Sequence, residues 1–453
     1  MLAAGRGTRM RSRTPKAWHR VGGLALIEHA LRSAQAATAA PPILVVPELA
    51  DSVRASLARR AELVLQREPR GTAAALAEAK DALVGAEVAL VLPADMPLLS
   101  PLSLTRLVEA LHHSDSGAAV LTATVVEAGG FGRIVRAPGG GLARIVEDAD
   151  EPWDGAPTEV NLGAYAFALP GLWEAMDELT ADNAQGEYYL SWLPQMVRGG
   201  AVTVELLDHD EAIQVNDRVQ LASAEEAMQR KTLRRLMLGG VTVVDPRATW
   251  IDCDVEIGQD TVIAPGTVIR GRSRIGAECL LGPFAELEDV EIGRGCRIGR
   301  SHLSGCKLAD GVDVGPFNRV RPESEMGPRS HLGTFTEVVR SRVGEGSQIP
   351  HLSYVGDAEV GRDVNYGAGS ITANWDGQMK HRTVIADGAR LGSGTILVAP
   401  VEVGPDAYTG AGSVITGSVP EGSLAVSRAR QRNILGWVAR RRAKGSADAE
   451  EGA

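Results

Sequence analysis

The sequence predicts an α/β domain followed by a parallel β-helix, and two repeating patterns lead to this prediction. Up to about residue 216, short apolar runs alternate with helical segments of about a dozen residues. From about residue 245 to 428, an aliphatic residue followed by glycine recurs instead, often at multiples of six residues. A chain of 453 residues is long enough for two or three domains, each with its own core.

The first section, residues 1–216, reads as an α/β domain. Its apolar runs are ILVV (43–46), AELVLQ (61–66) and VALVLPAD (88–95), and a helical pattern covers 72–84. Short strands that alternate with helices are typical of a parallel, doubly wound sheet with helices on both faces.

Residues 217–244 are predicted to be a connecting helix and linker. The run 217–238 contains no Gly or Pro and has apolar residues at helical spacing, and Gly239-Gly240 ends it. An ordinary surface helix would give the same pattern.

Residues 245–439 are predicted to be the β-helix. Ile275-Gly276, Ile298-Gly299 and Val343-Gly344 are examples of the recurring pair. A six-residue period indicates a solenoid in which the aliphatic side chains point inward and stack from coil to coil. We expect each glycine to provide a backbone conformation needed at a corner. The repeat is interrupted between Gly367 and Gly392, which predicts an extruded loop, and residues 440–453 have the composition of a disordered tail.

Composition excludes several classes of protein. The net charge of −10 argues against a nucleic-acid partner. No stretch of 18 apolar residues and no signal peptide is present, so the sequence predicts a cytoplasmic protein without a membrane partner. The four cysteines have no CxxC spacing and are expected to be buried free thiols.

The N-terminal string LAAGRGTRM, followed by Pro15-Lys16, has the character of a phosphate-binding loop. Gly5 and Gly7 let backbone N–H groups approach an anion, and Arg9 and Lys16 add positive charge. A glycine-rich loop alone is a weak signal, since a tight turn has the same residues.

The full string resembles the signature of sugar-1-phosphate nucleotidyltransferases. It is most similar to the bacterial family of bifunctional N-acetylglucosamine-1-phosphate uridylyltransferases/glucosamine-1-phosphate acetyltransferases. Further matches are LQREPRGTA (65–73), LPADMPLL (92–99), FGRIV (131–135), IVED (145–148), VNLGA (160–164), NAQGEYYL (183–190) and QVNDR (214–218).

The resemblance implies a Rossmann-like nucleotidyltransferase domain with four sets of site residues. Arg9 and Lys16 would be catalytic, and Asp95 and Asn216 would bind one Mg²⁺. The nucleotide would contact Leu2, Ala3, Ala4, Gly5, Lys16, Gln66, Gly71 and Thr72, and the sugar would contact Gly132, Glu147, Asn161 and Asn216.

The C-terminal half resembles the acetyltransferase half of the same family, a left-handed β-helix. The matching strings are PHLSYVGDAEVG (350–361), DVNYGAG (363–369) and ANWDG (373–377). By this resemblance His351 is the general base, a role that suits histidine because it titrates near neutral pH, and Asn374 is the second catalytic residue. The sugar phosphate would contact Arg321, Tyr354 and Asn365, and acetyl-CoA would contact Asn374, Trp375, Ser393, Ala411 and Arg428.

The implied activity has two steps. Acetyl-CoA acetylates glucosamine-1-phosphate, and UMP from UTP is then transferred to N-acetylglucosamine-1-phosphate. The products are UDP-N-acetylglucosamine, a precursor of the cell envelope, and pyrophosphate. Catalysis of such a transfer consists mainly of positioning and charge neutralisation. The resemblance also implies a homotrimer with acetyltransferase sites at subunit junctions.

The sequence departs from the family pattern at four places. Family members carry a strand before LAAG that is almost absent ahead of Leu2, either truly or because the start is misassigned, so the loop is expected to be poorly anchored. Pro93-Ala94 replaces Tyr-Gly, Val339 replaces a phosphate-binding lysine, and Trp375 replaces Tyr. Because side chains alternate along a strand, Arg340 is not expected to substitute for the lysine directly.

Three other interpretations remain open at this point. One is a transferase for another sugar-1-phosphate. Another is a non-catalytic regulatory homologue, which retention of Arg9, Lys16, Asp95 and His351 disfavours. The last is an intersubunit metal site at His302 and His331, as in carbonic anhydrases built on a β-helix.

Overall fold

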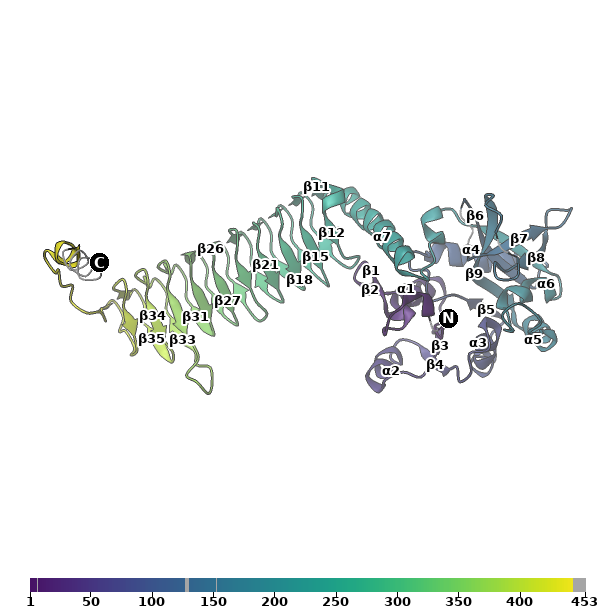
Figure 1. Cartoon of the computed structure of the whole chain (residues 1–453), viewed down its shortest axis with the longest axis horizontal. Helices are drawn as coiled ribbons and strands as arrows, with labels where there is room; N and C mark the ends of the chain where they lie inside the picture. The colour runs from purple at the N-terminus through teal and green to yellow at the C-terminus, as the bar shows by residue number, and fades with distance from the viewer. Residues whose placement is uncertain (6, 127–129, 152, 443–453) are drawn as a thin grey trace, which may run out of the picture. The chain divides into compact units, whose positions relative to one another are not determined.

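The computed structural model describes residues 1–5, 7–126, 130–151 and 153–442, which form two compact units (Figure 1). The first unit contains Met1–Arg235 together with Ile251–Asp254. The second contains Leu236–Trp250 and the chain from Val255 onward.

The first unit is built around a sheet with the strand order β10-β6-β9-β7-β8, and β5 also pairs with β9. A second, two-stranded parallel sheet consists of β3 and β4, and a short antiparallel hairpin consists of β1 and β2. The strands are β1 (Arg20–Val21), β2 (Leu24–Ala25), β3 (Ile43–Val46), β4 (Glu62–Leu65), β5 (Val88–Val91), β6 (Ala118–Val125), β7 (Gly132–Arg136), β8 (Leu142–Val146), β9 (Thr158–Ala168) and β10 (Ala201–Glu205). The helices are α1 (Leu26–Ala37), α2 (Asp51–Leu57), α3 (Thr72–Glu78), α4 (Pro101–His112), α5 (Leu169–Glu178) and α6 (Leu193–Met196), with 3₁₀ turns η1 (Thr8–Met10) and η2 (Lys16–Trp18).

The sheet is mixed, which differs from the parallel sheet that the sequence predicts. β3 and β4 run parallel, as do β10 and β6, but β9 runs antiparallel to β5, β6 and β7. The antiparallel β7–β8 pair precedes β9 along the chain, so successive strands here reverse direction without a crossover helix. A strand buried on both faces gives the same apolar run in either direction, and the sequence therefore does not specify it.

Leu2 lies between β3 and the end of β5 and forms parallel bridges to Val45 and Pro93. Its backbone N–H donates to Leu92 O at 2.9 Å, and the Ala3 N–H donates to Val45 O at 2.9 Å. The phosphate loop is therefore hydrogen-bonded to a strand on each side. The expectation of a poorly anchored loop was wrong for the residues that are present.

Side chains of the central strand β9 alternate between two apolar cores. Val160, Leu162 and Ala164 pack with residues of α4, while Tyr165 and Phe167 pack with residues of α5 and α6. This alternation follows from the two-residue period of a strand. Both faces of the sheet are covered, as the α/β prediction requires.

The predicted helix at 217–238 is α7 (Arg218–Leu238). Ala224, Ala227 and Met228 pack with Met10, Val21, Leu26 and Leu98 in the first unit. The start of α7 therefore holds the segment that carries Asn216 against the loop that follows the phosphate-binding glycines.

The second unit is the predicted left-handed parallel β-helix, with three parallel sheets that share one stack of coils (Figure 1). The first sheet contains β11 (Thr242–Val243), β14 (Val262–Ile263), β17 (Leu280–Leu281), β20 (Arg297–Ile298), β23 (Asp313–Val314), β26 (His331–Thr334) and β29 (Gln348–His351). From β15 onward the second contains β15 (Val268–Arg270), β18 (Glu286–Glu288), β21 (His302–Ser304), β24 (Arg319–Val320), β27 (Glu337–Val339), β30 (Tyr354–Gly356), β32 (Ile371–Ala373), β34 (Ile396–Val398) and β37 (Val414–Ile415). The third contains β13 (Glu256–Ile257), β16 (Arg274–Ile275), β19 (Glu291–Ile292), β22 (Lys307–Leu308), β25 (Glu325–Met326), β28 (Arg342–Val343), β31 (Ala358–Val360), β33 (Thr383–Ile385) and β35 (Val401–Val403).

The aliphatic residues of the repeat point inward, as predicted. Ile275, Ile298 and Val343 are each at most 5% exposed, whereas Ile257, near the start of the stack, is only half-buried. The cysteine prediction is confirmed in part: all four are free thiols, and Cys279, Cys296 and Cys306 are buried, whereas Cys253 is only half-buried.

The role that the sequence suggests for the repeated glycines was wrong at most of these positions. Gly276, Gly315 and Gly344 do not have positive φ. A Cβ added at Gly315 would lie 2.3 Å from Gly333 O, and one added at Gly344 would lie 2.2 Å from Gly361 O. Glycine is required because the next coil passes too close for a side chain. Gly282, with a φ of 90°, is an exception that does match the expected role.

The chain after β38 (Leu424–Ala425) includes a short helical segment at 437–442, so the predicted tail starts inside a helix. Residues 443–453 of that tail lie outside the described residues. Among the residues that are described, no helix combines the length and the apolar character needed to cross a membrane.

Gly344→Ala tests the close approach of coils. The new Cβ would collide with backbone atoms of Gly361, so we expect a loss of roughly 1–3 kcal/mol in the free energy of unfolding. Gly417→Ala is the matched control, since its Cβ would meet no atom within 4 Å. Thermal unfolding of the two variants should show a lower midpoint for Gly344→Ala only, and equal midpoints would contradict the packing argument.

Candidate active sites

A cavity of about 710 Å³ in the first unit collects most of the residues predicted for uridylyl transfer. Such a volume is ordinary for a small-molecule site. The predicted residues that line it are Leu2, Ala3, Ala4, Gly5, Lys16, Gln66, Gly71, Thr72, Asp95, Gly132, Glu147, Asn161 and Asn216. Segments far apart in the sequence thus converge on one cavity.

The phosphate loop and Lys16 form one wall of this cavity. Gly7 has a φ of 57°, and a Cβ added there would lie 2.6 Å from Lys16 Cβ. Glycine at this position therefore allows the loop to pack against the lysine stem. A Cβ added at Gly5 would meet nothing within 4 Å, so its backbone faces open space.

Lys16 connects the two predicted metal ligands. Its ammonium Nζ contacts Asp95 Oδ2 and lies 3.1 Å from Asn216 Oδ1. Asp95 follows strand β5 and is 6% exposed, and Asn216 precedes α7 and is 7% exposed. Two buried oxygens from distant segments therefore point at a single cation.

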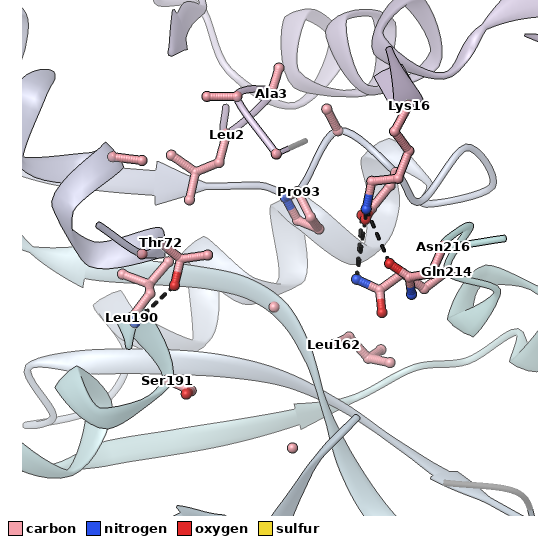
Figure 2. A pocket seen from close by; sticks show the side chains of 18 of the residues that line it. Leu2, Ala3, Lys16, Thr72, Pro93, Leu162, Leu190, Ser191, Gln214 and Asn216 are labelled. Carbon is pink, nitrogen blue, oxygen red and sulfur yellow. Dashed lines mark hydrogen bonds and ion pairs between the residues drawn. The ribbon is translucent and has the colours of Figure 1, made fainter. Parts of the chain in front are cut away.

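Gln214 also lies beside Asp95, although sequence reasoning did not assign it a role. Its Nε2 is 3.4 Å from each carboxylate oxygen of Asp95, and the Val215 N–H donates to Asp95 O at 2.9 Å. Figure 2 shows Lys16, Gln214 and Asn216 on the same side of the cavity. Gln214 is in the same matching string as Asn216, and that proximity was the only available signal.

Glu147 and Asn161 lie on the sugar side of the cavity. Burial raises the pKa of the Glu147 carboxyl, although a hydrogen bond donated by Ser191 Oγ opposes this rise. Asn161 Nδ2 lies 2.6 Å from the buried hydroxyl of Tyr165, and its Oδ1 accepts from the Gly163 N–H at 3.1 Å. Ser191 and Tyr165 line the cavity as well and were missed by sequence reasoning.

The segments that carry Thr72 and Leu190 are held together. The Leu190 N–H donates to Thr72 Oγ1 at 3.0 Å, and the Ala73 N–H donates to Tyr188 O at 3.0 Å (Figure 2). Gly71 has a φ of 113°, and a Cβ there would lie 2.6 Å from Tyr188 O. The strings 65–73 and 183–190 therefore form one wall, and glycine is needed for their contact.

Arg9 is the one residue predicted for this site that does not line the cavity. Its Nη1 lies 3.9 Å from the Cβ position that a side chain at Gly130 would have, and Gly130 does line the cavity. Its guanidinium is therefore at the rim. Pro93 and Ala94, which depart from the family pattern, both line the cavity.

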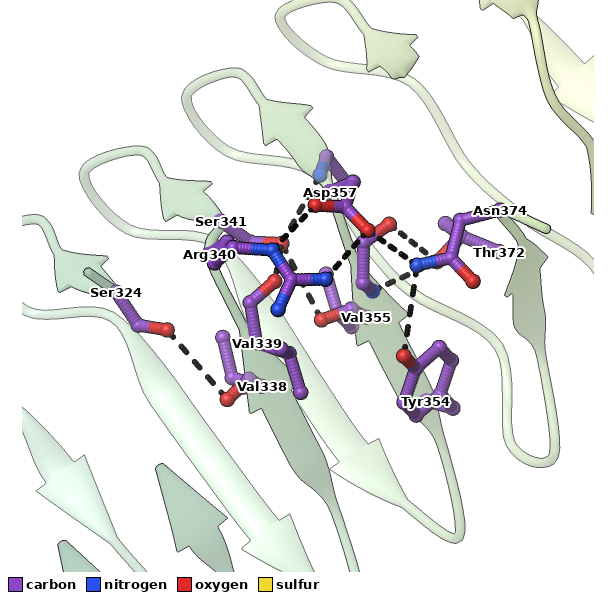
Figure 3. A network of polar contacts seen from close by, with 12 residues as sticks. Ser324, Val338, Val339, Arg340, Ser341, Tyr354, Val355, Asp357, Thr372 and Asn374 are labelled. Atoms are coloured by element: carbon purple, nitrogen blue, oxygen red, sulfur yellow. Dashed lines mark hydrogen bonds and ion pairs between the residues drawn. The ribbon is translucent and has the colours of Figure 1, made fainter. Parts of the chain in front are cut away.

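A second cluster of predicted residues lies on the outside of the β-helix, around β30 and the residues that follow β32 (Figure 3). Asn374 is 7% exposed, and its Nδ2 donates to Asp357 Oδ2 and lies 3.5 Å from the Tyr354 hydroxyl. Asp357 was not identified from the sequence. The hydrogen bond that it accepts from Asn374 shows that Asp357 anchors the Asn374 side chain.

Arg340 holds Asp357 through two parallel hydrogen bonds of 2.7 and 2.8 Å. These bonds, together with the one from Asn374, hold the pKa of the Asp357 carboxyl below its usual value. Arg340 has a φ of 45° and therefore stands at a corner, where the strand alternation behind our expectation does not apply. The side chain of Val339 is buried, and Arg340 is the cation that the structure hydrogen-bonds to this cluster, with Lys380 as a second positive charge near Asp357.

His351 ends strand β29 and is exposed, and its backbone pairs with Thr334 in the previous coil. Arg321 is paired with Glu337 at 3.3 Å, and Asn365 forms bridges to Gln348 and Arg390. Trp375 is 57% exposed and begins the extruded loop. Within the described part of the chain, none of these four predicted residues forms a side-chain hydrogen bond or ion pair with Asn374, and their roles stay predictions.

The residues predicted for acetyl-CoA lie further along the coils. Arg428 Nη1 donates to Ala411 O at 2.9 Å, and the Gly412 N–H donates to Ser393 O at 2.8 Å. Ser393, Ala411 and Arg428 therefore form an exposed strip over adjacent coils. By contrast, His302 and His331 lie on two different sheets, and His331 Nδ1 pairs with Asp313 at 3.0 Å.

Comparison with known proteins agrees with both halves. Residues 1–190 match the family described as the MobA-like NTP transferase domain. "Bifunctional protein GlmU" of Brevibacillus brevis is 42% identical over 451 residues, which cover 98% of each chain. The protein of that name from Kineococcus radiotolerans is 43% identical over 98% of this chain and 92% of its own, and the one from Caldanaerobacter subterraneus is 40% identical over 98% of each.

These identities extend over nearly the whole of both chains, and the α/β unit and the β-helix agree with them. Together they establish the family to which the chain belongs. The chain belongs to the GlmU family of bifunctional enzymes, which are both glucosamine-1-phosphate acetyltransferases and N-acetylglucosamine-1-phosphate uridylyltransferases.

Proposed function

We propose that the cavity of the first unit carries out uridylyl transfer and that the cluster on the β-helix carries out acetyl transfer. The observation that carries the first assignment is the convergence of the phosphate loop, Lys16, Asp95 and Asn216 on one cavity. For the second it is the Asn374–Asp357–Arg340 network close to Tyr354.

Asp95 and Asn216 fit a magnesium ion. Each presents a buried oxygen, and both oxygens already face a common cation, the Lys16 ammonium. Mg²⁺ prefers oxygen ligands and often keeps several waters, so one carboxylate, one amide oxygen and substrate phosphates form a suitable set. When bound, the ion supplies positive charge that neutralises the phosphates.

In the uridylyl step, an oxygen of the N-acetylglucosamine-1-phosphate phosphate attacks the α-phosphorus of UTP. The bond from that phosphorus to the bridging oxygen breaks, and pyrophosphate leaves. Lys16 and Arg9 hold the phosphates, and the backbone at Gly5 approaches them. Gln66, Gly71 and Thr72 contact the base, while Gly132, Glu147 and Asn161 contact the sugar.

In the acetyl step, the amine of glucosamine-1-phosphate attacks the thioester carbonyl. His351 accepts the amine proton, and CoA leaves as the thiolate. Because Nδ2 of Asn374 is committed to Asp357, its Oδ1 is the atom left for a ligand. Asn374 therefore accepts a hydrogen bond from the attacking amine, which orients the nucleophile.

The remaining residues of the second site bind the two substrates. Arg321, Tyr354 and Asn365 hold the sugar phosphate, with Arg340 as an added cation near Asn374. Trp375, Ser393, Ala411 and Arg428 hold acetyl-CoA. Since His351 and Trp375 are exposed in one chain, we propose a homotrimer in which neighbouring copies complete the site. Its substrates place the enzyme in the cytoplasm.

An assay that follows free CoA and pyrophosphate separately tests the two assignments. With glucosamine-1-phosphate, acetyl-CoA, UTP and Mg²⁺, His351→Ala should abolish CoA release but keep pyrophosphate release from supplied N-acetylglucosamine-1-phosphate. Asp95→Ala should do the reverse. Activity only with a different sugar-1-phosphate would change the substrate assignment, and a protein inactive with every sugar-1-phosphate would contradict the proposal.

Asp357→Ala tests the positioning of Asn374. Loss of a charge-assisted hydrogen bond of about 1.5–3 kcal/mol should lower kcat for CoA release by roughly 10- to 100-fold. The rate of pyrophosphate release should stay nearly unchanged, because the uridylyl step does not depend on the orientation of Asn374.

Asp387→Ala is the matched control, because Asp387 also forms an ion pair with an arginine, Arg362, at 2.7 Å, and among the described residues neither partner has a hydrogen bond or ion pair to a predicted site residue. Equal losses in the two variants would mean that Asp357 acts only through coil stability. No loss in either would exclude a positioning role.

A further inference from the structure

The Lys16 ammonium stands where the proposed metal ion would have to bind. It contacts Asp95 Oδ2 and lies 3.1 Å from Asn216 Oδ1, and these are the oxygens proposed as metal ligands. Its side chain is 19% exposed and that of Asp95 is 9% exposed, so bulk water screens the pair only partly. Lys16 is thus already the partner of a largely buried carboxylate.

A lysine ammonium and a divalent cation cannot share these two oxygens. At separations of a few ångströms their charges repel strongly, more so in a cavity partly shielded from water. Binding of the metal therefore requires Lys16 to move away. Gln214, whose Nε2 is 3.4 Å from both Asp95 oxygens, is neutral and can remain in place.

The cavity offers the displaced ammonium one favourable destination. Lysine carries its charge on a flexible four-carbon stem, so the ammonium can move while the backbone of η2 stays fixed. The stem packs against Gly7, and the open space at Gly5 lies in the same cavity. A triphosphate bound at this loop would attract the ammonium that the metal displaces.

We infer that Lys16 is the resident cation of the metal site in the nucleotide-free protein, and that the divalent metal enters together with the nucleoside triphosphate. The inference rests on the proposed function, since it takes Asp95 and Asn216 as metal ligands. Without nucleotide, the metal must break the Lys16 contacts with no compensation. With nucleotide, the phosphates take over Lys16 and also bind the metal, so each ligand strengthens the binding of the other.

Calorimetric titration with Mn²⁺ as the probe tests this directly, without measuring turnover. The wild-type protein should bind Mn²⁺ weakly in the absence of nucleotide. Lys16→Met and Lys16→Gln should bind it at least tenfold more tightly, since the competing ammonium is gone. Arg13→Gln is the matched control: it removes an exposed positive charge from the same segment and should leave the affinity unchanged.

Two further arms separate the inference from the proposed function. The preformed Mn²⁺–UTP complex should bind wild type more tightly than Asp95→Asn, and Asp95→Asn added to Lys16→Met should remove the gained Mn²⁺ affinity. If Asp95→Asn has no effect on the Mn²⁺–UTP complex, the proposed metal site is wrong. If it does, but both Lys16 variants bind nucleotide-free Mn²⁺ no better than wild type, the resident-cation inference alone is overturned. Circular dichroism of each variant checks that it is folded.

Discussion

The buried charge of Asp95 is the constraint on which the nucleotide cavity depends. A carboxylate that is 6% exposed has to be compensated within the protein, because desolvation of an unpaired charge is costly. Its partners come from near both ends of the α/β unit: Lys16 from the segment after the phosphate loop, and Gln214 and Val215 from the segment before α7. One carboxylate thus holds together segments that are some 200 residues apart in sequence.

The β-helix depends on a different constraint, the close stacking of successive coils. Glycine follows the inward aliphatic residue because the next coil leaves no space for a Cβ. The corners, by contrast, are often occupied by larger residues with positive φ, among them Arg340, Leu352 and Asp357. Such conformations cost of order 1 kcal/mol or more each and are tolerated only where the surroundings fix them. Stacking thereby places Arg340 and Asp357 at corners of adjacent coils, where their side chains pair.

Much of this could be predicted from sequence because it depends on local period or on contiguous strings. The inward aliphatic residues follow from the six-residue repeat, and most cavity residues lie in strings that match the family. The antiparallel direction of β9 was missed because an apolar run has no direction. Gln214 and Asp357 were missed because their significance depends on neighbours in space. Arg340 was considered, but it was judged by strand alternation, which its corner conformation overrides.

The two sites differ in how their polar groups are prepared for ligands. In the α/β cavity, groups proposed to bind ligand are paired with one another, so binding has to exchange one set of ion contacts for another. On the β-helix, Asn374 is paired with Asp357, which is held in turn by Arg340, while the exposed His351 is left for substrate. The acetyl site is therefore preorganised, because Asn374 is held in place before a ligand binds. The uridylyl site must gather several anions. Because its resident contacts are exchanged only when those anions arrive, the buried carboxylate of Asp95 stays compensated throughout.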